Sequence, residues 1–181
     1  MAVALADAAP PKPILDDDEY LLRGSGPMAW ACDAPPGKFN QVHAVAAGEH
    51  VVVTGTIHVV TMHPTPVYNG LAFIGFYDTK SKRTINLQLL TTDYAPHKIS
   101  FSILNGNFGS NDSVFSEQPN QVSDFPFTLR LDQGRVSISV AGVDIQSRAR
   151  PTALNGLTLG CGGAHVEFTS LVIAVQPPTN E

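Results

Sequence analysis

The sequence predicts an all-β fold, a sandwich of two antiparallel sheets. Short stretches of alternating apolar and polar residues recur along the chain, turn-forming residues separate them, and no stretch has the apolar period of an amphipathic helix. The chain has 181 residues, including 15 glycines and 14 prolines, which suits one domain of many short strands. We expect a single sandwich domain over residues 20–176, an Ala/Pro-rich and acidic tail at 1–19, and a short tail at 177–181.

The first half of the chain opens with an expected edge strand at 20–22 and a Gly- and Pro-rich loop at 24–38. The next strand, at 51–62, alternates between an apolar face and a polar face with Thr54, Thr56 and His58. Residues 71–77 form a strand that is apolar on both faces. The strands expected at 84–90 and 98–104 carry Asn86, Gln88, Ser100 and Ser102 on their polar faces.

The second half of the chain begins with a segment at 105–124 that is nearly free of apolar residues. We expect a long loop there, and long loops inside a domain are often functional. Strands at 127–131 and 135–140 are expected to form a hairpin across a turn at residues 132–134. Shorter strands are expected at 143–146 and 157–159, and a final strand at 165–175.

Composition argues against several classes of partner and cofactor. The net charge is −5 and no cluster of Lys and Arg occurs, so we expect no nucleic-acid partner. No apolar run is long enough to span a membrane, and no His, Cys or acidic residues have the spacing of metal ligands, so we expect no membrane span, metal or cofactor. The start of the chain lacks an intact export signal. We expect a cytoplasmic protein or one secreted without such a signal, and a processed exported form also fits.

The two cysteines, Cys32 and Cys161, leave two interpretations open. A disulfide would tie the N-terminal segment to the last strands. The alternative is two free buried thiols, and we favour it because free cysteine is among the most buried residue types.

Several motifs resemble those of the galectins, a family of β-sandwich lectins. They are GEHVVVTGTI at 48–57, NGNFG at 105–109, FPF at 125–127, FTLRLDQGRVSISVAGVDI at 127–145 and LTLGCGGAHVEFTSLV at 157–172. The resemblance spans roughly residues 48–175. It implies a jelly-roll sandwich of the concanavalin-A-like type.

The galactose-binding signature of the galectins is not retained. Where the family has the His, Asn and Arg of its H-x-N-P-R motif, this chain has Gln88, Leu90 and Thr92. The stacking tryptophan of the family falls on Phe108, or on Phe115 if the loop is placed differently, and the glutamate that follows it falls on Asn111 or near Glu117. We therefore expect an altered site without useful lactose binding. Neither the acidic run of the laminarinase-type hydrolases nor the glutamine–histidine strand of the alginate lyases occurs.

The candidate site is the polar face of the strands. If the strands share one sheet, their hydroxyl and amide groups make a hydrogen-bonding surface suited to neutral sugars. An aromatic side chain, that of Phe108, Phe115 or Trp30, would stack on the sugar ring. The expected ligand-binding residues are His58, Asn86, Gln88, Ser102, Phe108 and Glu117.

Function is expected to follow this surface. The first hypothesis is a carbohydrate- or glycoconjugate-binding module with a glycan or glycoprotein ligand, and the exposed sheet edges of a sandwich allow a homodimer. The second is an enzyme, a lyase, hydrolase or cyclase that uses the concave polar face, with His58 as a base and Tyr77 as an acid. The third is a structural or protein-interaction domain. We assign no catalytic residue, since neither a pocket nor an orienting partner is visible in the sequence.

Overall fold

β-Strands make up every regular element that the structure describes. The computed structural model describes residues 20–22, 26–46, 48–81, 83–106, 110–112, 117–119, 124–147 and 154–175. In chain order the strands are β1 (Tyr20–Leu22), β2 (Met28–Val45), β3 (His50–Met62), β4 (Gly70–Tyr77), β5 (Thr84–Thr92), β6 (Ala95–Gly106), β7 (Ser110–Asp112), β8 (Glu117–Pro119), β9 (Asp124–Asp132), β10 (Arg135–Val140), β11 (Val143–Gln146) and β12 (Gly156–Val175). Within these residues no helix is long and apolar enough to cross a membrane.

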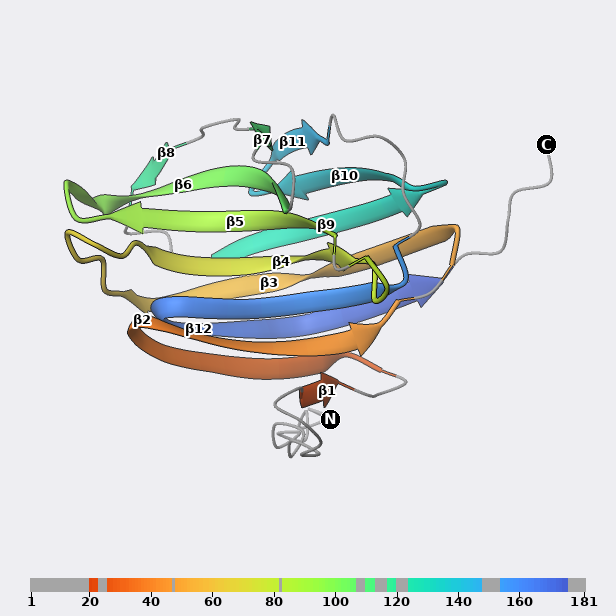
Figure 1. The fold of residues 1–181 in the computed structure, drawn as a ribbon, viewed down its shortest axis with the longest axis horizontal. Helices are drawn as coiled ribbons and strands as arrows, with labels where there is room; N and C mark the ends of the chain where they lie inside the picture. The colour runs from red at the N-terminus through yellow and green to blue at the C-terminus, as the bar shows by residue number, and fades with distance from the viewer. Residues whose placement is uncertain are drawn as a thin grey trace, which may run out of the picture.

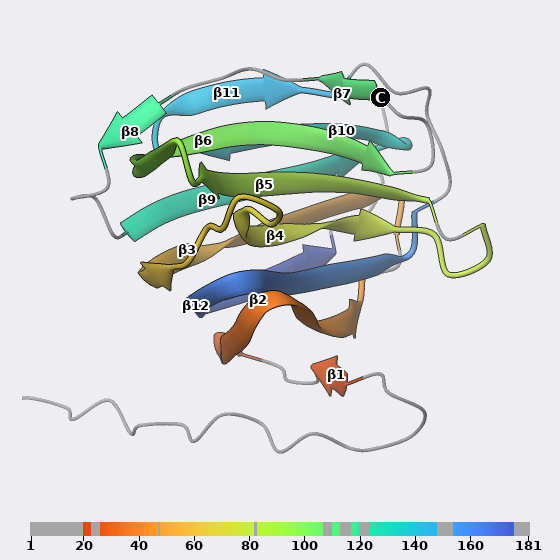
Figure 2. The same ribbon diagram turned by 60° about the vertical axis from the view of Figure 1, so that its left-hand side comes forward.

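The strands form two layers that share their two longest members (Figures 1 and 2). The front sheet has the order β2-β12-β4-β5-β6, with the short strands β7 and β8 paired to β6. The back sheet has the order β2-β12-β3-β9-β10-β11. All pairings are antiparallel except that of β1 with β2. The predicted all-β sandwich is therefore confirmed, with its two sheets joined into one hydrogen-bonded network.

β12 passes from the front sheet to the back sheet at Gly163. Residues 156–162 pair with β4, and residues 164–175 pair with β3. Gly163 has a φ of 54°, a left-handed conformation that glycine adopts without strain. The register between β12 and β2 shifts at the same place. Figure 1 shows both long strands turning back together at the left of the view.

A disulfide crosses this bend between Cys32, in the back half of β2, and Cys161, in the front half of β12. The expectation of two free thiols is wrong. The cysteines are 129 residues apart in sequence, yet they lie in neighbouring strands that fold over together. Sequence spacing carries no sign of that pairing.

The hydrophobic core lies between the two sheets. The inward-facing side chains of the front sheet include Ile74, Leu87 and Phe101, and those of the back sheet include Leu129 and Phe168, all fully buried. Leu87 and Phe101 belong to the apolar faces that alternation predicts for their strands. The polar faces therefore point outward on both sides of the sandwich.

Turn chemistry fixes one hairpin as the sequence predicts. β9 and β10 pair across Gln133 and Gly134, which have φ angles of 47° and 78°. Two consecutive positive φ angles define the type I′ turn, which matches the twist of a hairpin.

Two predicted segments differ from the structure. The expected loop at 24–38 is wrong from Met28 onward, because β2 begins there and buries Cys32 and Ala34. The strands expected at 157–159 and 165–175 are one strand, β12. The predicted tails at 1–19 and 177–181 and most of the predicted loop at 105–124 lie outside the described residues.

Candidate functional site

A groove of about 610 Å³ lies on the outer face of the front sheet. We call it the front groove. Its described polar lining is Gln41, His43, Thr84, Asn86, Gln88 and Thr158. Its described apolar and aromatic lining is Phe39, Leu71, Phe73, Tyr77 and Leu104. These residues come from β2, β4, β5, β6 and β12, so every strand of the front sheet proper contributes.

The floor of the front groove is built from aromatic rings that lie over glycines. On the outer face of β12, Gly162 faces Phe39, Gly160 faces Phe73 and Gly156 faces Tyr77. A Cβ added at Gly162 would lie 2.7 Å from Phe39 Cε1, and one at Gly160 would lie 2.5 Å from Phe73 Cζ. A side chain at any of these glycines would displace the ring opposite. Because glycine has no side chain, the aromatic rings can pack directly against the backbone of β12.

Polar side chains cross the middle of the front groove in one row. The register places His43, Thr158, Gly75 and Asn86 next to one another on β2, β12, β4 and β5. Asn86 Oδ1 lies over Gly75, because a Cβ at Gly75 would overlap it. The His43 ring lies against the Tyr77 ring, with centroids 4.8 Å apart.

Two atoms of this row are buried without a partner. Asn86 is 7% exposed and Thr158 is 3% exposed. Neither Asn86 Oδ1 nor Thr158 Oγ1 has a hydrogen-bond partner. Buried polar atoms are nearly always hydrogen-bonded, since leaving one unmatched costs about 1–3 kcal/mol. Both residues line the front groove.

Hydrogen bonds just outside the front groove hold Tyr77 in place. The backbone N–H of Asn155 donates to the Tyr77 carbonyl at 3.0 Å, immediately before Gly156. The Asn155 side chain also exchanges two hydrogen bonds of 3.0 Å with Thr79. In the following turn the Asp78 carboxylate accepts from the Ser81 hydroxyl and two backbone N–H groups, which lowers the Asp78 pKa below its ordinary value. Tyr77 is therefore positioned by its neighbours rather than by packing alone.

The described lining of the front groove is electrically neutral apart from His43. It contains no Asp, Glu, Lys or Arg. Hydrolysis of a glycoside requires a pair of carboxylic acids beside the bond. The described lining of the front groove does not contain such a pair.

The structure brings together three of the predicted site residues. Asn86 and Gln88 line the front groove, and Ser102 faces Gln88 on the neighbouring strand β6. Phe108 lies outside the described residues. Glu117 belongs to β8, opposite Ser100, but its side chain is not among those described.

His58 does not belong to this group. β3 lies in the back sheet, so His58 points outward on the opposite side of the sandwich, with Thr54 and Thr56 on the same strand face. Its Nδ1 atom is 2.6 Å from Asp124 Oδ1. The expectation that all the polar strand faces share one surface is therefore wrong. So is the pairing of His58 with Tyr77, since Tyr77 lies in the front groove.

Sequence reasoning missed His43, Thr158 and Phe73 as lining residues of the groove, and it named Tyr77 only as a possible acid for His58. The apolar character of β4 on both faces suggested only burial, although Phe73 and Tyr77 form the outer floor. A usable signal was present in β12, where glycines at 156, 160 and 162 and Thr158 share one face. Small residues on one face of a strand mark a place that something else approaches closely.

In sequence, no family model matches the chain and no curated protein matches it significantly. Solved structures share its fold. The CBM2 module of the evolved Dit of Lactobacillus casei BL23 phage J-1 has a TM-score of 0.58 at 8% identity, covering 87% of this chain and 81% of that one. The PL7 alginate lyase of Zobellia galactanivorans has a TM-score of 0.58 at 11% identity, covering 94% and 86%. Sheep galectin-11 has a TM-score of 0.41 at 11% identity, covering 78% and 100%. At these identities the likeness to the first two structures shows the jelly-roll fold alone.

Proposed function

We propose that the chain is a binding module for neutral glycans and that the front groove holds the ligand. The observation that carries this proposal is the pair of buried, unmatched atoms, Asn86 Oδ1 and Thr158 Oγ1, beside an aromatic floor. Sugar hydroxyls donate to both atoms once the Asn86 and Thr158 side chains turn toward the groove, since neither atom is exposed in the unliganded chain. A sugar also offers an apolar ring face that packs on an aromatic ring.

The neutral character of the lining selects among ligands. An amide or a hydroxyl binds a sugar hydroxyl without the cost of burying a charge. Anionic glycans are best held by Arg and Lys, and the described lining of the front groove has neither. Neutral hexose or pentose units therefore suit it better than uronates.

The fold supports a glycan as the class of ligand, but it does not identify the particular glycan. One structural neighbour is a CBM2 module and another is an alginate lyase. The resemblance to the galectins supports the same ligand class with an altered site. Gln88, Leu90 and Thr92 replace the three polar residues of the galectin signature, so we expect no submillimolar binding of lactose by calorimetry.

An enzyme is the second candidate, and one observation favours it. His43 and Tyr77, an acid–base pair by chemistry, are in ring contact inside the front groove. In a lyase, that acid–base pair would lie beside a uronate unit of the substrate. Elimination at the uronate leaves an unsaturated sugar that absorbs ultraviolet light. Incubation with alginate and other polyuronates would show that product. We expect none, because the described lining offers no cation for the carboxylate.

The test is a panel of soluble neutral polysaccharides, β-glucan, xylan, mannan and galactan, in affinity electrophoresis. We expect retardation by at least one polymer. Gln88→Ala should weaken it by at least about tenfold. The matched control is Gln146→Ala, an exposed glutamine on the back sheet, which should leave it unchanged. Absence of binding to every polymer would favour a structural or protein-interaction domain.

The disulfide also supports a proposal about the compartment. Disulfides form and persist in oxidising environments and are rare in the cytosol. The bond between Cys32 and Cys161 therefore supports a protein that works outside the cytosol.

A further inference from the structure

We infer that the front groove takes an internal stretch of a linear polysaccharide that runs along β12, rather than a single terminal sugar. The inference rests on the proposed function and adds the class and direction of the ligand. It depends on how the rings, the polar atoms and the ends of the groove are arranged.

The aromatic rings form a line along one strand. They lie over Gly162, Gly160 and Gly156 of β12, leaning in from β2 and from β4. Six residues of a strand span roughly 20 Å. That length is several sugar units, so the line is too long for one monosaccharide. Rings that flank a strand from both sides and lean over it define a direction parallel to that strand.

The polar atoms lie within this line and not at its end. Thr158 sits midway between Gly160 and Gly156 on the same face of β12. Asn86 lies in the same row as Thr158. Stacking positions therefore stand on either side of a hydrogen-bonding position. A chain of sugars presents ring faces and hydroxyl groups in the same repeating way.

Exposed residues stand at both ends of the line. Phe39, over Gly162, is 67% exposed, and Val45, opposite Gly156, is also exposed. Beyond Phe39, the loop that precedes β4 carries the exposed Tyr68, whose ring lies over Gly37. That loop is fixed by a 2.7 Å hydrogen bond from the Thr65 N–H to the Tyr68 carbonyl. A chain can continue past Phe39 onto a second preordered ring.

The experiment is a length series. Cello-, xylo- and manno-oligosaccharides from disaccharide to hexasaccharide are titrated calorimetrically into the full chain. In the series that matches the bound polymer, we expect the hexasaccharide to bind at least about tenfold more tightly than the disaccharide. Equal affinities for disaccharide and hexasaccharide would overturn the inference and leave the proposed function standing. Failure of every oligosaccharide and polymer to bind would overturn both.

Two variants test the direction of the chain. Phe39→Leu keeps an apolar side chain but removes the ring, and it should weaken hexasaccharide binding by at least about fivefold with little effect on the disaccharide. Tyr94→Leu is the control, because Tyr94 is 85% exposed in the β5–β6 turn and does not line the front groove. An equal loss from Tyr94→Leu would show that the chain crosses the strands instead. Unchanged melting temperatures confirm that both variants fold.

Discussion

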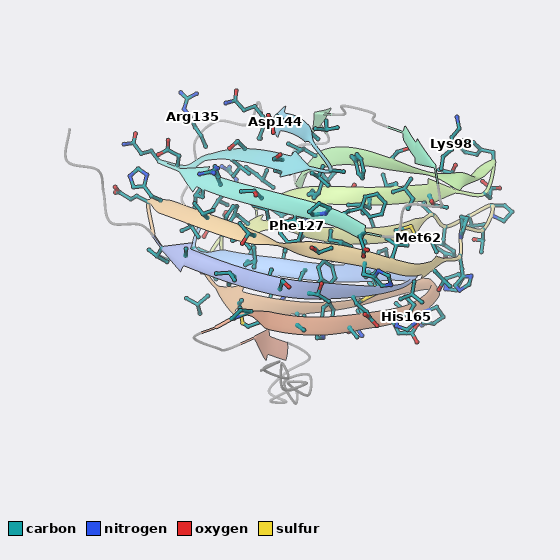
Figure 3. All side chains as sticks on the ribbon, turned by 180° about the vertical axis from the view of Figure 1, so that it is seen from behind. Met62, Lys98, Phe127, Arg135, Asp144 and His165 are labelled. Carbon is teal, nitrogen blue, oxygen red and sulfur yellow. A yellow bond between two sulfur atoms is a disulfide. The ribbon has the colours of Figure 1, made fainter. Side chains whose placement is uncertain are left out.

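The two outer faces of the sandwich are hollowed to a similar size and differ in chemistry. The front groove has a volume of about 610 Å³. The back sheet carries a hollow of about 660 Å³ whose polar lining is Thr128, Arg130, Ser137, Ser139, Asp144 and Gln146, with no aromatic residue among the described lining. Figure 3 views the molecule from this side, with Asp144 labelled. On the same face His50 and His58 pair with Asp132 and Asp124 at 2.8 and 2.6 Å.

The two hollows therefore differ in the chemistry of their linings and not in their volumes. On the back sheet, His50 and His58 are both paired with an exposed aspartate, so these side chains already have hydrogen-bond partners. In the front groove, Asn86 Oδ1 and Thr158 Oγ1 are buried and have no hydrogen-bond partner. A ligand that donates hydrogen bonds would therefore gain more in the front groove than on the back sheet. The predictions below test that contrast, from the largest expected effect to the smallest.

The largest effect on stability should come from loss of the disulfide, because it joins β2 and β12, the two strands that belong to both sheets. The bond closes a loop of 129 residues, and chain-entropy arguments give it a stabilisation of about 5 kcal/mol. The double variant Cys32→Ala/Cys161→Ala should lower the free energy of unfolding by that order in urea titrations. Reduction of the wild type should act the same way. An unchanged urea midpoint after verified reduction would refute this role for the bond.

The second-largest effect on stability should come from a substitution in the floor of the front groove. Gly160→Ala places a methyl group against the Phe73 ring and 2.6 Å from the Asn40 carbonyl oxygen. Overpacking of this kind costs about 1–3 kcal/mol, and the displaced ring should also weaken glycan binding. Gly26→Ala is the control, because a Cβ there meets nothing within 4 Å. A Gly160→Ala protein as stable as the wild type would mean that the ring is not seated on the glycine.

Much of the fold could be predicted because strand signals are local. Neighbouring residues in the sequence are enough to predict the alternation of β3 and β5 and the turn at Gln133 and Gly134. β2 could not be predicted, since its Gly- and Pro-rich sequence becomes a strand only through pairing with β12, more than a hundred residues later. The disulfide was missed for the same reason.

The candidate site was predicted only in part. Asn86, Gln88 and Ser102 were found because alternation on one strand shows which side chains face outward. His58 was misplaced because alternation does not reveal to which sheet a strand belongs. His43 and Thr158 meet only through the register of distant strands, and that register follows from the whole topology.

A smaller effect on the free energy of unfolding should distinguish the fully buried hydroxyl of Thr158 from the half-buried hydroxyl of Thr128. Thr158→Val removes a buried Oγ1 that has no partner and keeps the shape of the side chain. We expect the free energy of unfolding to rise by about 1 kcal/mol while glycan affinity falls. Thr128→Val makes the same change on the half-buried Thr128 of the back sheet and should change stability by less than about 0.5 kcal/mol. Destabilisation by Thr158→Val would reveal a hydrogen bond and remove the main support for a ligand there.

The smallest effect should come from His58, on the back sheet. Its side chain is 37% exposed and that of its partner Asp124 is 66% exposed, so solvent screens the pair strongly. Exposed ion pairs contribute about 0–1 kcal/mol, and His58→Ala should change the unfolding free energy by no more than that. Glycan affinity should stay the same, because His58 and the front groove lie on opposite sides of the core. Calorimetry of the variant with the bound oligosaccharide measures this. A tenfold loss of affinity would mean that the back sheet contacts the ligand, and the contrast between the two faces would then no longer locate the site.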